Sequence, residues 1–229
     1  MTEGRPALLD GIKTVAPLLI GVTPFGLVFG VTAAGTEIGG GLGYATSIII
    51  FAGAAQFATV QLIAAGSTAA VVIATAFVIN ARHAMYSAAM APYFQNFPRW
   101  YRWALPYLLT DEAFGVSIVR FRHEKDPGYQ RWFYIGSALA LWTTWQVTTG
   151  LGVILGTQVP QSWSLDFALP LTFIALLAPL LNTRPAVAAA VVAGLGALIA
   201  NGVSYNLGLL IGAAAGIAAG VMAGRVTTR

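Results

Sequence analysis

The sequence predicts an all-α, polytopic membrane protein. Three observations support this fold class: 57% of the 229 residues are hydrophobic, only 9% are charged, and the apolar residues form long continuous runs. A soluble domain carries about 25% charged residues, so this chain has too few polar side chains to cover a surface in water. In lipid, only helices and closed barrels satisfy the backbone, and barrel strands would show short alternating segments. The continuous runs therefore predict a helical bundle.

Eight apolar runs approach the roughly 20 residues that a membrane-spanning helix needs. They cover residues 15–34, 44–65, 68–91, 104–119, 132–155, 167–181, 185–200 and 205–223. The runs at 104–119, 167–181 and 185–200 are short, which is compatible with half-helices that break inside the membrane. Residues 1–17 lack the features of a removable signal peptide. We expect a single membrane domain over residues 1–229.

The basic residues of the loops predict the orientation, because cytoplasmic loops are enriched in Lys and Arg. With eight spans and a cytoplasmic N-terminus, nine basic residues fall inside and two outside. The inside set is Arg5, Lys13, Arg120, Arg122, Lys125, Arg131, Arg184, Arg225 and Arg229, and the outside set is Arg99 and Arg102. This bias predicts a multi-pass protein of the inner (cytoplasmic) membrane with both termini in the cytoplasm. The net charge of +4 then reflects loop topology and does not indicate a nucleic-acid partner.

The first run carries Pro17, Pro24 and the glycines Gly21, Gly26 and Gly30. Each internal proline removes a helical hydrogen bond and bends the axis. Freed carbonyls persist in a membrane only where protein or a water-filled cavity covers them. We expect this helix to be bent or locally unwound towards the interior; a kinked helix without a ligand is an equally good interpretation.

The second run places Gln56 among small residues that include Gly53. Such an amide either bonds a neighbouring helix or contacts a substrate, and the small neighbours allow close backbone approach. The turn Ala65-Gly66-Ser67 predicts that the second and third spans form an antiparallel hairpin.

The third run contains Asn80, Arg82, His83 and Tyr86. An arginine at the centre of a membrane helix costs about 3 kcal/mol, so it needs a partner. At about 100° per residue, Arg82 and Tyr86 lie nearly in line, with the other two on a neighbouring part of the helix surface. The polar side chains predict a functional cavity. The structural alternative is that Arg82 is an ion-paired strut and His83 bonds a carbonyl.

The fourth run supplies the adjacent acids Asp111 and Glu112, the natural partners of Arg82. We place the pair near mid-span. Neighbouring helical residues point about 100° apart, so one acid would pair with Arg82 and the other would face a cavity. A carboxyl in an apolar site resists ionisation, which makes the pair candidate proton carriers. Alternatively, Thr110-Asp111-Glu112 is a helix cap at a break.

The later runs are plainer. The fifth run is rich in polar residues, including Thr144, Gln146 and Thr148, and the eighth carries a glycine every four residues from Gly208 to Gly224. That glycine ridge predicts close helix packing, either within the chain or against a partner subunit.

The sequence lacks the residues that several kinds of metal, cofactor and catalytic site require. Cysteine is absent, and the two histidines, His83 and His123, cannot build a paired-histidine zinc motif. A nucleotide-binding glycine loop is also missing. We expect no metal, no cofactor and no enzymatic activity, but a transporter. An ion or proton channel, or a structural subunit of a membrane complex, would share the buried charges and the glycine ridge.

Four motifs resemble the AzlC/YgaZ family, the large subunits of two-component branched-chain amino-acid exporters. They are Pro24-Phe25-Gly26-x-x-x-Gly30, Phe51-Ala-Gly53-Ala54-x-Gln56-Phe57, Asn80-x-Arg82-His83-x-x-Tyr86-Ser87 and Thr110-Asp111-Glu112-x-Phe114. Ala81 departs from the leucine expected in the third motif. The resemblance implies export of valine, leucine or isoleucine, sometimes methionine, and a small membrane partner of the AzlD/YgaH type.

A zwitterionic substrate needs an anionic partner, a cationic or N–H-rich partner and an apolar wall. Asp111 or Glu112, then Arg82 or the first helix, then Phe25, Phe51 and Phe57 would supply these. The candidate substrate-binding residues are Arg82, His83, Asn80, Tyr86, Asp111, Glu112, Gln56, Phe25, Pro24, Gly26 and Gly53.

Overall fold

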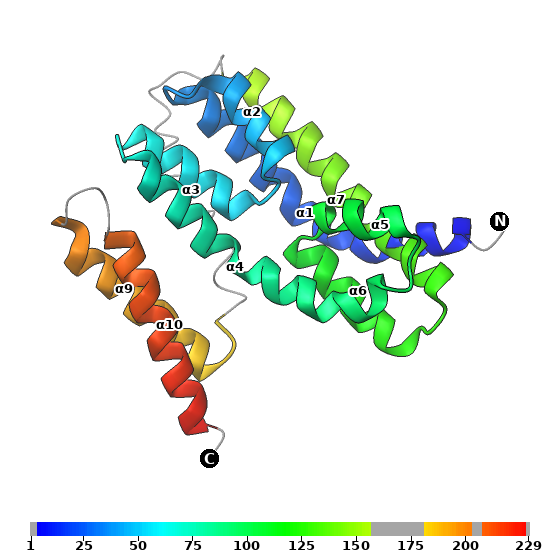
Figure 1. Cartoon of the computed structure of the whole chain (residues 1–229). Coiled ribbons are helices and arrows are strands. Elements are labelled where there is room, and N and C mark those ends of the chain that lie inside the picture. Colours follow the sequence, from blue (N-terminus) through cyan, green and yellow to red (C-terminus); the bar gives the residue numbers. More distant parts are fainter. Residues whose placement is uncertain (1–3, 157–180, 203–207, 228–229) are drawn as a thin grey trace. The chain divides into compact units, whose positions relative to one another are not determined.

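The computed structural model describes residues 4–156, 181–202 and 208–227 (Figure 1). The chain forms two compact units, Met1–Phe57 with Phe77–Val159 and Ala58–Ala76 with Pro160–Arg229. In the described ranges every regular element is a helix, which confirms the all-α prediction there. The expectation of a single domain stays a prediction. The expected sixth span, 167–181, falls almost wholly outside the described residues.

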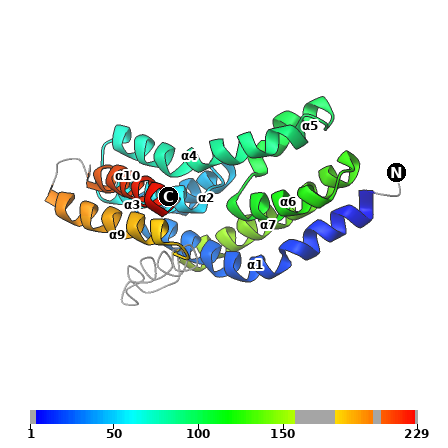
Figure 2. The ribbon, with the colours of Figure 1, turned by 90° about the horizontal axis from the view of Figure 1, so that it is seen from below.

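The centre of the first unit is the pair of long helices α1 (Gly4–Gly35) and α7 (Pro127–Gly156), which lie side by side in both views (Figures 1 and 2). Glycines on each helix face the backbone of the other. A Cβ at Gly11 or Gly30 would collide with α7 carbonyl oxygens, and one at Gly136 or Gly152 would collide with those of α1. The two backbones are therefore in direct contact, as small residues permit in membrane bundles.

Helix α1 is continuous through both internal prolines, so the prediction of local unwinding in the first span is wrong. A proline removes only its own N–H from the hydrogen-bond ladder. The neighbouring turns keep theirs, so the helix continues, while the bend at the prolines stays a prediction.

The second predicted span, 44–65, is the one that breaks. It forms α2 (Gly39–Ile49) and α3 (Gly53–Ala64), separated at Phe51, whose φ of 42° lies in the left-handed region. A bulky residue adopts this conformation only where its surroundings enforce it. Phe51 is buried, and its ring centroid lies 6.0 Å from that of Tyr107.

A glycine turn ends α3. Gly66 has a φ of 69°; its N–H bonds the Ile63 carbonyl, and the Ser67 N–H bonds the Leu62 carbonyl, both at 2.9 Å. This is a Schellman motif. It leads directly into α4 (Ala69–Phe94), which matches the predicted third span.

The fourth predicted span, 104–119, is not one helix. The chain forms α5 (Arg99–Ala104), the 3₁₀ turn η1 (Leu105–Leu108) and then α6 (Asp111–His123). By length and composition, α1, α4 and α7 can each cross a membrane. The count of eight spans therefore stays a prediction.

In the second unit, α9 (Arg184–Ile199) leads through η5 (Ala200–Gly202) towards α10 (Gly208–Thr227). The glycine ridge of α10 packs on α9. A Cβ at Gly212 would lie 2.6 Å from the Ala193 carbonyl oxygen, and one at Gly216 would lie 2.7 Å from that of Ala189. The ridge thus serves packing within the chain, the first of the two predicted uses.

Candidate functional site

The predicted meeting of opposite charges occurs between α4 and α6. An Arg82 guanidinium nitrogen lies 3.0 Å from Asp111 Oδ2, and the Tyr86 hydroxyl donates to Asp111 Oδ1 at 2.7 Å. Both carboxylate oxygens are therefore engaged, one by each α4 side chain. The Arg82 and Asp111 side chains are 31% and 40% exposed, so the pair is accessible from one side.

Asp111 is positioned by the start of α6. Thr110 is the N-cap residue, and its Oγ1 accepts a hydrogen bond from the Ala113 N–H. Asp111 and Glu112 occupy the first turn, where the positive end of the helix dipole favours carboxylates. The mid-span placement of the pair is wrong, and the helix-cap interpretation is confirmed. The preceding residues are not α-helical, so both acids lie at a helix end, and Asp111 faces Arg82.

The two acids point in different directions, as their 100° separation on a helix requires. Asp111 pairs with Arg82 and Tyr86 of α4, whereas Glu112 is the second acid of the first turn of α6.

The other two polar residues of α4 lie beside this ion pair. His83 Nδ1 donates to the Asn80 carbonyl oxygen at 3.3 Å, the structural role considered for it, and its ring meets the Tyr86 ring edge-on at 5.8 Å. The Tyr86 ring in turn stacks on Phe114 of α6 at 4.4 Å. Within the described chain, Asn80 Oδ1 and Arg82 Nε are buried without a hydrogen-bond partner.

The second polar centre is Gln56, which joins the two halves of the broken helix. Its Oε1 accepts from the Ala52 N–H at 3.1 Å, and its Nε2 donates to the hydroxyls of Thr46 at 3.0 Å and Ser47 at 2.9 Å. The side chain is fully buried. It connects the Ala52 N–H and two hydroxyls of α2 to α3 across the break, so the role as interhelical glue is observed.

Residues far away in the sequence bond further polar groups at the break, including two backbone carbonyls. Gln146 of α7 donates to the Ser47 carbonyl at 2.9 Å, and Trp145 donates to the Ser47 hydroxyl at 3.2 Å. Tyr107 of η1 donates to the Ile48 carbonyl. These residues were missed from the sequence. Gln146 belongs to the polar section noted in the fifth span, but nothing in the sequence assigns it to this carbonyl.

An aromatic cluster lines the start of α3. Phe25 stacks on Phe57 with ring centroids 4.9 Å apart and meets Trp145 edge-on at 5.4 Å. A Cβ at Gly53 would lie 2.7 Å from the Phe25 ring and 3.0 Å from Trp145. Position 53 therefore requires a glycine, because these rings occupy the space that a side chain would need. Phe25 and Phe57 therefore belong to one aromatic cluster, and their role as the apolar wall of a substrate site stays a prediction.

Two predicted site residues have other positions. Pro24 lies on the exposed side of α1, and Gly26 faces Thr148 of α7. Among the contacts of the described chain, none joins Gln56 to the Arg82–Asp111 pair. Tyr107, at the break, precedes Thr110 by three residues, and this short stretch links the two centres. Within residues 4–156, 181–202 and 208–227, no three His, Cys, Asp or Glu side chains lie close enough together to hold a metal ion.

Comparison with known proteins gives the same family from an independent direction. The AzlC protein family model matches residues 17–159. The chain is 26% identical to the inner membrane protein YgaZ of Escherichia coli over 76% of this chain and 73% of that protein. It is 30% identical to an uncharacterized membrane protein of Archaeoglobus fulgidus over 76% of each. No solved structure matches. The matched region contains both polar centres and all four motifs, and the chain belongs to the AzlC family.

Proposed function

We propose that this protein is a secondary transporter that exports branched-chain amino acids, namely valine, leucine, isoleucine and in some cases methionine. The observation that carries the proposal is the Arg82–Asp111–Tyr86 cluster at the start of α6, in a chain of the AzlC family. Charged side chains are rare in the helices of membrane proteins and usually mark a functional site. The substrate class comes from the family resemblance.

The proposed topology has eight spans in the inner membrane and both termini in the cytoplasm. Contacts at one end of the first unit support it. Arg120, at the end of α6, and Tyr129, at the start of α7, both donate to Asp10 near the start of α1. The N-terminal segment and the loop at 120–131 therefore lie at the same end, as the distribution of basic residues requires.

Recognition of a zwitterion at this cluster would proceed by exchange of partners. Asp111 is already bound by Arg82 and Tyr86, so the substrate ammonium would compete for its oxygens while the substrate carboxylate takes the released guanidinium. The buried Arg82 Nε lacks a partner in the described chain and adds a second donor to that fork. The rings near the break, Phe25 and Phe57, would supply the apolar wall.

Two further parts of the proposal concern partners. A small membrane subunit of the AzlD/YgaH type would complete the transporter, as the family resemblance implies. Proton coupling through the acid pair is also proposed, because a carboxyl that exchanges partners in an apolar site can bind and release a proton.

The test is leucine efflux from cells that express Arg82→Ala or Asp111→Asn together with the small subunit. We expect each variant to lose efflux at an unchanged level in the membrane. Arg99→Ala removes a basic residue elsewhere in the chain and is the matched control, with efflux retained. Full efflux in either site variant would refute the assignment.

A second measurement separates a transporter from a channel. Proteoliposomes preloaded with unlabelled leucine should transiently accumulate labelled leucine, because a carrier exchanges one substrate for another. A channel would give no such transient. A structural subunit would tolerate replacement of Arg82 and Asp111 by a packed apolar pair.

A further inference from the structure

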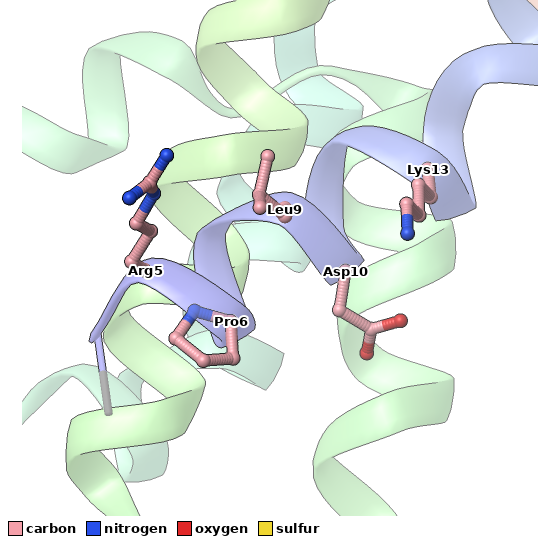
Figure 3. A pocket seen from close by; sticks show the side chains of 5 residues that line it. All are labelled: Arg5, Pro6, Leu9, Asp10 and Lys13. Atoms are coloured by element: carbon pink, nitrogen blue, oxygen red, sulfur yellow. The ribbon is translucent and has the colours of Figure 1, made fainter. Parts of the chain in front are cut away.

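The first turns of α1 present a surface that the transport proposal does not use. A hollow lies there, lined by Arg5, Pro6, Leu9, Asp10 and Lys13 (Figure 3). Arg5, Leu9 and Lys13 recur every four residues, and all three are exposed. Figure 3 shows Leu9 between the two basic side chains along the helix. This face of α1 thus alternates cation, apolar side chain and cation.

The carboxylate in the hollow does not cancel these cations. Asp10 Oδ2 accepts hydrogen bonds from both Arg120 and Tyr129, so its charge is already compensated by the Arg120 guanidinium. Arg120 is held by a further bond from its Nε to the Tyr129 hydroxyl at 3.2 Å. The hollow is therefore cationic, with Arg5 and Lys13 as its available charges.

We propose that this hollow binds the headgroup of an anionic membrane phospholipid, with Arg5 and Lys13 on the phosphate and Leu9 and Pro6 against the start of the acyl chains. The two cations are eight residues apart, about 12 Å along the axis, and both side chains are long enough to reach one headgroup from opposite sides. A soluble phosphate would use the cations but leave the apolar pair without a function. An amphipathic lipid uses both.

The surroundings agree with this ligand. The hollow is on the part of α1 that precedes its long apolar section, where a headgroup lies relative to a spanning helix. The loop that meets α1 at this end does so through Arg120 and Tyr129 on Asp10, and its Arg122 and Lys125 lie outside the lining of the hollow. Clusters of basic residues beside membrane helices attract anionic lipids at about 1 kcal/mol per residue. That value predicts about a fivefold loss of lipid affinity for each cation removed.

The experiment uses the full chain, purified in a neutral detergent and titrated with phosphatidylglycerol, with bound lipid measured by native mass spectrometry. The double variant Arg5→Gln/Lys13→Gln should bind the lipid about 25-fold more weakly, the product of two fivefold losses. Arg122→Gln/Lys125→Gln is the matched control: it removes the same charge from exposed positions at the same end, outside the lining of the hollow, and should bind within about twofold of the unaltered protein, a difference close to experimental scatter.

Two further arms identify the ligand. Phosphatidylcholine should bind far more weakly, and soluble glycerol phosphate should not compete at concentrations that saturate the lipid. Leu9→Asn should weaken lipid binding while thermal unfolding and gel filtration stay unchanged. Equal losses in the two double variants would overturn the proposal, and so would displacement of the lipid by glycerol phosphate. No arm depends on amino-acid transport, so this proposal can fail without the other.

Discussion

Replacing Gln56 by leucine removes the side chain that bridges α2 and α3 while keeping a similar volume. The Ala52 N–H, bonded to Gln56 Oε1 at 3.1 Å, would remain buried without an acceptor, at a cost of about 1–3 kcal/mol. The two hydroxyls lose less: Thr46 keeps its bond to the Gly43 carbonyl, and Ser47 keeps that from Trp145. The expected loss in the free energy of unfolding is about 2–3 kcal/mol.

The assay is unfolding of the purified protein in mixed micelles, followed by circular dichroism. Gln61→Leu is the matched control, because Gln61 lies in the same helix but is exposed; its effect should stay within about 0.5 kcal/mol. If Gln56→Leu unfolds at the same point as the control, then the bridge contributes nothing and the break is held by other contacts.

Two other substitutions test the helix ends and the glycine packing. Thr110→Ala removes the cap that accepts the Ala113 N–H and should lower the free energy of unfolding by about 1 kcal/mol, as measured in the same assay. An unchanged value would mean that Thr110 does not cap α6. Gly212→Ala should destabilise the protein, because its Cβ would lie 2.6 Å from the Ala193 carbonyl oxygen. Gly224→Ala, whose Cβ meets nothing within 4 Å, should stabilise helix α10 by about 0.5–1 kcal/mol. If both glycine variants changed the free energy of unfolding in the same direction, the packing of α10 on α9 would be contradicted.

The parts of the fold that the sequence predicted are those with a local cause. Helix α4 follows from a long, mostly apolar run that begins after a glycine turn. Helix α7 contains the apolar run predicted at 132–155. The ion pair was also predictable, since Arg82 needs an anion and the nearest acids in the chain are Asp111 and Glu112.

The position of the helix break could not be predicted, because its cause is not local. The prolines of the first span suggested a break there, yet α1 is continuous. The real break, at Phe51, contains no proline and depends on Gln146 and Tyr107, which are more than 50 residues away along the chain. The sequence marks only Gln56 as unusual.

The prediction that the acid pair lies within one continuous helix was wrong for a related reason. The apolar run 104–119 suggested one helix, but the segment from Leu105 to Leu109 turns and extends before Thr110 caps α6. A cap signal was visible in Thr110-Asp111-Glu112. The hydropathy of the run favoured one continuous helix instead. In the structure, the hydrogen bond from the Ala113 N–H to Thr110 starts a new helix at this point.

The direct backbone contact of α1 with α7 has a consequence for how the protein can change shape. Two helices touching through glycines cannot slide or rotate past one another without first separating, because a side chain brought to the position of Gly11, Gly30, Gly136 or Gly152 would collide with a carbonyl oxygen of the other helix. By contrast, α6 meets α4 through long side chains, an ion pair, a hydroxyl and stacked rings, which can re-form after a displacement. Any alternation between inward-open and outward-open states would therefore take α1 and α7 along as one stiff piece and place the moving joint between α4 and α6.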